Sequence, residues 1–208
     1  MVGHSWSTLV ALAWGLDAPD TTHGIVLLGG YYYPTTRIDA VVVAPAAAPV
    51  IGPVLRRTVA PPFARVTLQP TLKGMFSPRA VPEDYVQDVP PGLIARPSQI
   101  RAVAEEGTMM VREATRLSKR IDRLRVPVGI MAGRADEVVD PAAQSVRLAA
   151  DLARKPERMV ELAIEPDAGH MVHHAAPARV ASMIALVSAA RNEAVGADRG
   201  TTPAGSRI

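Results

Sequence analysis

The sequence contains no cysteine, and aromatic residues make up only 4% of it. Disulfide bonds, zinc sites built on thiolates and a cysteine nucleophile are therefore excluded. The 23 Lys and Arg residues exceed the 20 Asp and Glu residues only slightly, which leaves a net charge of +3. With so small an excess and few aromatic rings for base stacking, we expect no nucleic-acid partner.

A long uninterrupted apolar run is also lacking. The most apolar stretch, residues 40–55, contains Pro45, Pro49 and Pro53, and it is shorter than the ~20 residues that a membrane helix needs. The start of the sequence does not have the charged, apolar and small-residue segments of a signal peptide. We therefore expect no transmembrane segment, no signal peptide and a cytoplasmic location.

The apolar segments that are present follow an α/β pattern. Residues 7–16 are small or apolar and predict a buried helix, and "HGIVLLGG" (residues 23–30) predicts a parallel strand that is covered on both faces. Two further apolar runs predict strands at residues 126–133 and 158–165, with helices from Pro141 and over residues 177–191. The fold class is therefore α/β, with a mostly parallel sheet and helices on both faces.

Proline interrupts this pattern. Twelve of the 19 prolines lie in residues 34–97, where so many prolines disfavour a regular alternation of strands and helices. We predict an inserted, mainly helical cap of short helices and turns over residues 34–120, which ends in a helix at residues 98–120. Residues 1–33 and 121–193 then form the core, and the polar residues 194–208 a disordered tail.

The first residues, Gly3-His4-Ser5-Trp6-Ser7, are typical of a serine on a sharp turn between a strand and a helix. A serine nucleophile needs a base, and the base needs a carboxylate that orients it. Asp136 follows one predicted strand and His170 follows the next, in the order serine, acid, histidine. The alternatives are a helix cap for Ser5, Asp140 as the acid, and an ordinary loop role for His170.

These residues resemble the α/β-hydrolase superfamily, in particular capped bacterial esterase-like and proline-iminopeptidase-like enzymes. The resemblance extends from Met1 to about Arg191, through the turn at Ser5 and the segments "IVLLGGYYYPT", "VPVGIMAGRADEVVDP" and "DAGHMVHHAAP". It implies that Ser5 is the nucleophile, Asp136 the acid, His170 the base, and the Trp6 N–H an oxyanion donor. It implies no metal and no organic cofactor.

The sequence departs from this superfamily in two ways. Ser7 stands where the superfamily usually has glycine, and the strands before the turn, about 80 residues by mean element lengths, have no counterpart. In the superfamily, the segment before the turn also contains the loop that carries the second oxyanion donor. Loss of one such donor typically lowers the rate by a factor of about 100 to 1,000. We expect "GIVLLGG" to form an exposed sheet edge through which the chain self-associates.

Two further groups of residues are candidates for a site. Tyr31 and Tyr32 follow the strand "GIVLLGG" at the end where open α/β sheets bind ligands, so they are candidate substrate contacts. His170, His173 and His174 have a spacing that could suit a metal, but no carboxylate completes the ligand set, and we expect none. The predicted function is a serine hydrolase of an apolar acyl substrate; the alternative is a silent remnant that acts as an interaction module.

Overall fold

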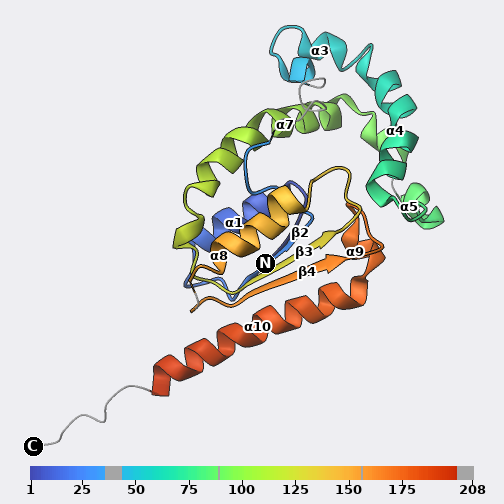
Figure 1. Ribbon diagram of the computed structural model, residues 1–208. Coiled ribbons are helices and arrows are strands. Elements are labelled where there is room, and N and C mark those ends of the chain that lie inside the picture. The colour runs from blue at the N-terminus through green and yellow to red at the C-terminus, as the bar shows by residue number, and fades with distance from the viewer. Residues whose placement is uncertain (36–43, 89, 156, 201–208) are drawn as a thin grey trace, which may run out of the picture.

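The computed structural model describes residues 1–35, 44–88, 90–155 and 157–200 (Figure 1). Within these residues the strands form one parallel sheet in the order β1-β2-β3-β4. The strands are β1 (Val2–His4), β2 (Ile25–Leu28), β3 (Val128–Gly133) and β4 (Val160–Glu165). Because parallel neighbours require crossover connections, helices lie between successive strands, and all four strands end at the same edge of the sheet.

Helices cover both faces of this sheet (Figure 1). The core helices and turns are α1 (Ser7–Asp17), η2 (Ile121–Arg123), η3 (Ala142–Val146), α8 (Arg147–Leu152), α9 (Val172–Ala175) and α10 (Pro177–Gly200). Ile25 and Leu27 of β2 pack in the cluster that includes α1 and α8, whereas Val26 and Leu28 pack in the cluster on the α10 side. The continuous apolar sequence of β2 thus reflects burial on two faces.

The described helices between β2 and η2 form an arch above the sheet (Figure 1). In the described part of this segment the regular elements are all helical: η1 (Ala44–Ala47), α3 (Gly52–Leu55), α4 (Ala60–Phe76), α5 (Glu83–Asp88), α6 (Pro91–Ile94) and α7 (Pro97–Ser118). We call α3 to α7 the cap helices. Met110, Ala114 and Leu117 of α7 join the core cluster beside α1, which fixes one side of the arch to the sheet.

The length of α4 differs from the expectation of short helices and turns. This helix has 17 residues although it contains three prolines. Pro61 and Pro62 lie in its first turn, where the missing N–H groups would have no helical partner in any case. Pro70 lies in the helix interior, where it lacks the N–H for one helical hydrogen bond. Its side chain is exposed and lines the cavity described below.

Two other expectations are corrected by the structure. The strand in "GIVLLGG" is not an edge, because β2 pairs with β1 on one side and β3 on the other and is buried along its whole length. The edge on that side is the short strand β1. The tail predicted as disordered from residue 194 continues α10 to Gly200; residues 201–208 lie outside the described residues.

Candidate active site

Ser5 lies in the two-residue turn between β1 and α1. Its φ angle of 55° is left-handed, a conformation that costs a non-glycine residue about 1 kcal/mol or more. The turn also brings the start of α1 back against β1: a Cβ atom on Gly3 would lie 2.6 Å from the Ser7 carbonyl oxygen. Gly3 is therefore required by a close approach of two backbone segments, as the sequence pattern predicted.

Hydrogen bonds hold the strained residue in place. The Ser5 N–H donates to the Leu28 carbonyl at 2.9 Å, which ties the turn to the end of β2. The Ser5 carbonyl accepts from both the hydroxyl and the N–H of Thr8, at 2.6 and 3.2 Å. These contacts use the backbone groups of Ser5 and leave its hydroxyl to face the cavity described below.

The serine at position 7 has a clear structural role. Its side chain is exposed, so a Cβ atom fits where the superfamily usually has glycine. The Ser7 hydroxyl accepts a hydrogen bond from the His4 N–H and donates one to the His4 carbonyl, each at 2.8 Å. The substitution therefore adds a bridge across the turn and keeps its shape.

His170 lies in the loop between β4 and α9 and is 1% exposed. Its Nε2 atom is 2.9 Å from the Ser5 hydroxyl oxygen, and its Nδ1 atom is 2.9 Å from Oδ2 of Asp136. Because a carboxylate accepts hydrogen bonds, we assign the imidazole hydrogen to Nδ1. Nε2 then has a free lone pair and can accept the proton of Ser5.

Asp136 is placed by the loop after β3. Its Oδ1 atom accepts the N–H groups of Val138 and Val139 at 2.9 and 2.8 Å, which leaves Oδ2 for His170. The alternative acid, Asp140, instead caps the following helical turn, because its Oδ1 accepts the N–H groups of residues 142 and 143. Of the two candidates, Asp136 is the carboxylate beside the histidine.

Gly29 lies directly against this pair. Its φ angle is +49°, and a Cβ atom there would lie 3.2 Å from the His170 carbonyl oxygen and 3.5 Å from Oδ2 of Asp136. Both the backbone conformation and the lack of space therefore favour glycine at the end of β2.

Two further histidines pack beside His170. His4 Nε2 donates to the His170 carbonyl at 3.0 Å, and the rings of His4 and His173 are 4.4 Å apart. Burial lowers the pKa of His4. Burial and the nearby histidines lower the pKa of His173 to about 4, so both rings are neutral at pH 7 and do not compete with His170 for Asp136.

The spacing of His170, His173 and His174 does not produce a ligand set. His174 instead packs its ring against Phe76 and Tyr85. Among the described residues, no group of three or more His, Asp or Glu side chains is arranged to hold a metal ion.

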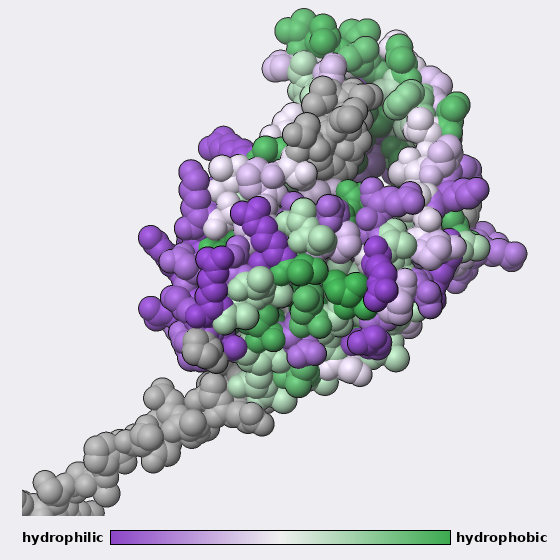
Figure 2. Space-filling view, viewed as in Figure 1, coloured by the Kyte–Doolittle hydropathy of each residue, from purple (hydrophilic) through white to green (hydrophobic). Residues whose placement is uncertain are grey.

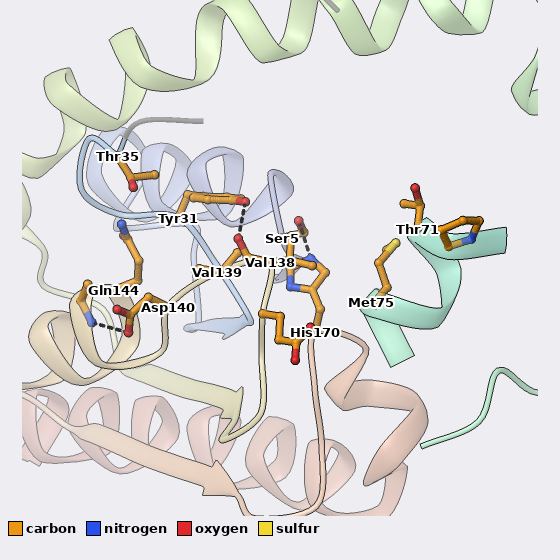
Figure 3. A pocket seen from close by; sticks show the side chains of 14 residues that line it. Ser5, Tyr31, Thr35, Thr71, Met75, Val138, Val139, Asp140, Gln144 and His170 are labelled. Carbon is orange, nitrogen blue, oxygen red and sulfur yellow. Dashed lines mark hydrogen bonds between the residues drawn. The ribbon is translucent and has the colours of Figure 1, made fainter. Parts of the chain in front are cut away.

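A cavity of about 710 Å³ opens above Ser5 and His170 (Figure 3). We call it the serine cavity. The loop after β3 and Tyr31 form one wall, and Thr71 and Met75 of α4 form the opposite wall. Sequence reasoning missed the contribution of α4, because nothing in its sequence indicates which of its faces meets a site almost 70 residues away in the chain.

The two tyrosine candidates have different positions. Tyr31 lines the serine cavity, and its hydroxyl donates to the Val138 carbonyl at 3.3 Å. Tyr32 is 0% exposed and lies in the core cluster, where burial raises its pKa. Tyr32 does not line the serine cavity, whereas Tyr31 does, so the structure does not support Tyr32 as a substrate contact.

Gln144 was also missed by sequence reasoning. This residue is 3% exposed, lines the serine cavity and lies in the π-helical turn η3. Its Oε1 accepts the N–H groups of Tyr32 and Tyr33 at 2.8 and 2.9 Å, and its Nε2 donates to the Tyr33 carbonyl at 3.1 Å. A π-helical turn often marks a functional site, but no local sequence signal predicts one here.

Trp6 follows Ser5 directly and precedes the first residue of α1. Its indole N–H donates to the carbonyl of Glu106 in α7 at 3.3 Å, so the side chain reaches a cap helix. Its backbone N–H lies at the N-terminal end of α1, where helix geometry favours negative charge.

The cap helices are joined to the loop that carries His170. The Met171 N–H donates to the carbonyl of Met75 at the end of α4, at 3.2 Å. Arg79 donates from Nε to the carbonyl of Asp167 and from Nη1 to the carbonyl of Ala175, both at 2.9 Å. The end of α4 and Arg79, which follows it, therefore hold the loop around His170 and the end of α9.

The fold and this geometry define a protein of the α/β-hydrolase superfamily. Residues 1–176 match the family model described as "Serine aminopeptidase, S33", and the chain belongs to this family. No curated protein matches the sequence. Within the described residues, none of the helices combines the length and apolarity that crossing a membrane would require.

Solved structures support the same fold. The α/β hydrolase MGS-M2 from a Medee basin deep-sea metagenome library has a TM-score of 0.67 at 14% identity, over 100% of this chain and 66% of its own. The epoxide hydrolase CorEH has a TM-score of 0.62 at 19% identity, over 90% and 66% of the two chains. The enol-lactonase of Burkholderia xenovorans LB400 has a TM-score of 0.55 at 18% identity, over 89% and 64%. This chain thus spans no more than 66% of the length of these structures.

Proposed function

We propose that this chain is a serine hydrolase that cleaves an ester or related acyl bond through a covalent acyl-enzyme. The observation that carries the proposal is the continuous hydrogen-bonded chain from Ser5 through His170 to Asp136, with both distances at 2.9 Å. The left-handed φ angle of Ser5 adds to it, because strain at a non-glycine residue is often retained at reactive sites.

The proposed reaction has two steps. His170 Nε2 takes the hydroxyl proton as Ser5 Oγ bonds to the substrate carbonyl carbon, and the bond to the leaving alcohol breaks as His170 returns the proton to that oxygen. Water then gives a proton to His170 and attacks the acyl carbon, and the bond between that carbon and Ser5 Oγ breaks as His170 returns the proton to Oγ, which releases the free acid. Asp136 supports the imidazolium that forms in each step.

Trp6 is the proposed oxyanion donor. Its N–H lies at the start of α1, next to the atom that attacks, and the helix dipole favours the negative charge that develops on the carbonyl oxygen. Such a donor is worth about 3 to 4 kcal/mol of transition-state stabilisation.

The test is covalent labelling with a fluorophosphonate, followed by mass spectrometry of the labelled peptide. We expect the adduct on Ser5, its loss in Ser5→Ala and its retention in Ser188→Ala, since Ser188 lies on α10 and donates to the Ile184 carbonyl far from His170. Labelling that persists in Ser5→Ala would exclude Ser5 as the nucleophile. A wild-type chain that is folded but unlabelled would instead favour the interaction-module alternative.

A further inference from the structure

A second cavity lies within the cap helices. It has a volume of about 350 Å³ and is enclosed by η1, α3, α4, α6 and α7; we call it the cap cavity. Among the described residues that line it, every side chain is apolar except that of Thr67. Its volume is within the range of small-molecule sites, which is about 300 to 1,000 Å³.

The cap cavity and the serine cavity follow one another along the same face of α4. Ala60, Ala64 and Thr67 line the cap cavity, and Thr71 and Gly74 line the serine cavity. Steps of four, three, four and three residues keep side chains on one face of a helix. Thr67 and Thr71 are one turn apart, or about 6 Å along the helix axis. A ligand that enters beside Ser5 and follows α4 therefore reaches the cap cavity within one turn.

The chemistry of the cap cavity suits a hydrocarbon. The Thr67 hydroxyl donates to the Phe63 carbonyl of its own helix at 2.9 Å, so its hydrogen-bonding group is already satisfied. Val59 and Phe63, which line the cavity, are 63% and 52% exposed. Apolar residues also gather on the surface over α3 at the top of the molecule (Figure 2). Apolar surface left uncovered in this way indicates a binding site.

We propose that the cap cavity binds the distal part of a long, unbranched acyl chain whose carbonyl carbon lies at Ser5. The proposal rests on the proposed function, and it specifies the substrate class as long-chain acyl esters. The carbonyl end occupies the serine cavity between Met75 and Tyr31, and the chain then follows the α4 face past Thr71 and Thr67.

Two esters and one cavity-filling variant test the proposal. Ala64→Phe adds a ring that points into the cap cavity, and Gln69→Phe adds the same ring at an exposed position of α4 that lines neither cavity. In Ala64→Phe we expect kcat/KM to fall about tenfold or more for p-nitrophenyl laurate, because apolar pockets discriminate at this level for small changes in fit. We expect less than about a twofold change for p-nitrophenyl acetate, and no selective loss in Gln69→Phe.

A second variant tests the cap cavity independently, in case Ala64→Phe does not fold. Val103→Asp places a carboxylate in the wall formed by α7, at a side chain that is already 47% exposed. It should cause the same selective loss of laurate hydrolysis. Equal losses for both esters, or no loss with laurate in either variant, would overturn the proposal.

A binding measurement separates this proposal from the proposed function. If wild-type protein hydrolyses neither ester, the proposed function fails, and binding of fluorescent dansylaminoundecanoate to Ser5→Ala still tests the cap cavity. Loss of this binding when Ala64→Phe is combined with Ser5→Ala would support the cap cavity as the binding site of the acyl chain. Binding that is unchanged by Ala64→Phe, or absent in Ser5→Ala, overturns it.

Discussion

Replacement of Gln144 by leucine should destabilise the protein through the loop at residues 31–33. The buried amide of Gln144 accepts two backbone N–H groups of this loop and donates to one carbonyl. Leucine has a similar volume but offers no hydrogen bond. Gln144→Leu therefore leaves the N–H groups of Tyr32 and Tyr33 and the carbonyl of Tyr33 without their side-chain partner.

The magnitude follows from the number of groups affected. A buried polar group that loses its partner costs about 1 to 3 kcal/mol, and here three groups do so. Gln144 lines the serine cavity, so water can reach part of the exposed backbone and lower the total cost. We expect a loss of about 2 to 4 kcal/mol in the free energy of unfolding, or about 4 to 16 °C in Tm for a chain of this size.

Urea and thermal unfolding measure the effect, with Gln99→Leu as the control. Gln99 lies exposed in the first turn of α7, where such a change stays within about 0.5 kcal/mol. The KM for an ester should also rise in Gln144→Leu, because Tyr31 of the same loop forms a wall of the serine cavity. A Gln144→Leu protein as stable as Gln99→Leu would refute the view that this amide holds the loop.

Two other substitutions test the surroundings of His170. Arg79→Ala removes the hydrogen bonds to the carbonyls of Asp167 and Ala175. Because Arg79 is exposed, the free energy of unfolding should change by only about 1 kcal/mol. The value of kcat should fall more than KM rises, and Arg79→Lys should partly restore it. Equal kinetics in wild type and Arg79→Ala would contradict this positioning role. The low pKa of His173 means that the unfolded chain takes up a proton below about pH 6.5 while the folded protein does not, so stability should fall from pH 6.5 towards 4 and level off below. The free energy of unfolding should change with pH by at most about 1.4 kcal/mol per pH unit, and by less because the ring is partly exposed. Urea titrations from pH 4 to 8 should show a shallower pH dependence in His173→Asn. Identical pH dependence in both proteins would exclude His173 as its source.

Strands β2, β3 and β4 and the order of the loops could be predicted because the signals are local, whereas the pairing of β1 with β2 was not expected. A strand buried on both faces must be apolar at every position, and "IVLL" and "VGIMAG" are. Once the strands are parallel, their carboxyl ends share one edge of the sheet, so the residues after β1, β3 and β4 converge. Ser5, Asp136 and His170 follow these three strands, and they meet at hydrogen-bonding distance.

The supporting contacts could not be predicted, because they join segments that are distant in sequence. Gln144 bonds to a loop more than 110 residues earlier, and the end of α4 bonds to the loop around His170 almost 100 residues later. Nor does the sequence "YYY" say which of Tyr31 and Tyr32 faces the cavity, because both residues are aromatic and lie outside a regular strand. Sequence patterns report local conformation and burial, whereas these contacts depend on how whole helices pack.

The junction between α4 and the His170 loop connects the helix that lines both cavities to the proposed catalytic base. The first half of α4 lines the cap cavity and its second half lines the serine cavity. Met75, in the last turn of the helix, accepts a hydrogen bond from Met171, the residue after His170. Gly169 lies against the Ser77 carbonyl so closely that no Cβ atom would fit between them. Because closely packed segments have low compressibility and transmit strain, a displacement of α4 would also strain the support of His170. Substitutions in the last turn of α4, which bonds to Met171, should therefore affect kcat as well as KM.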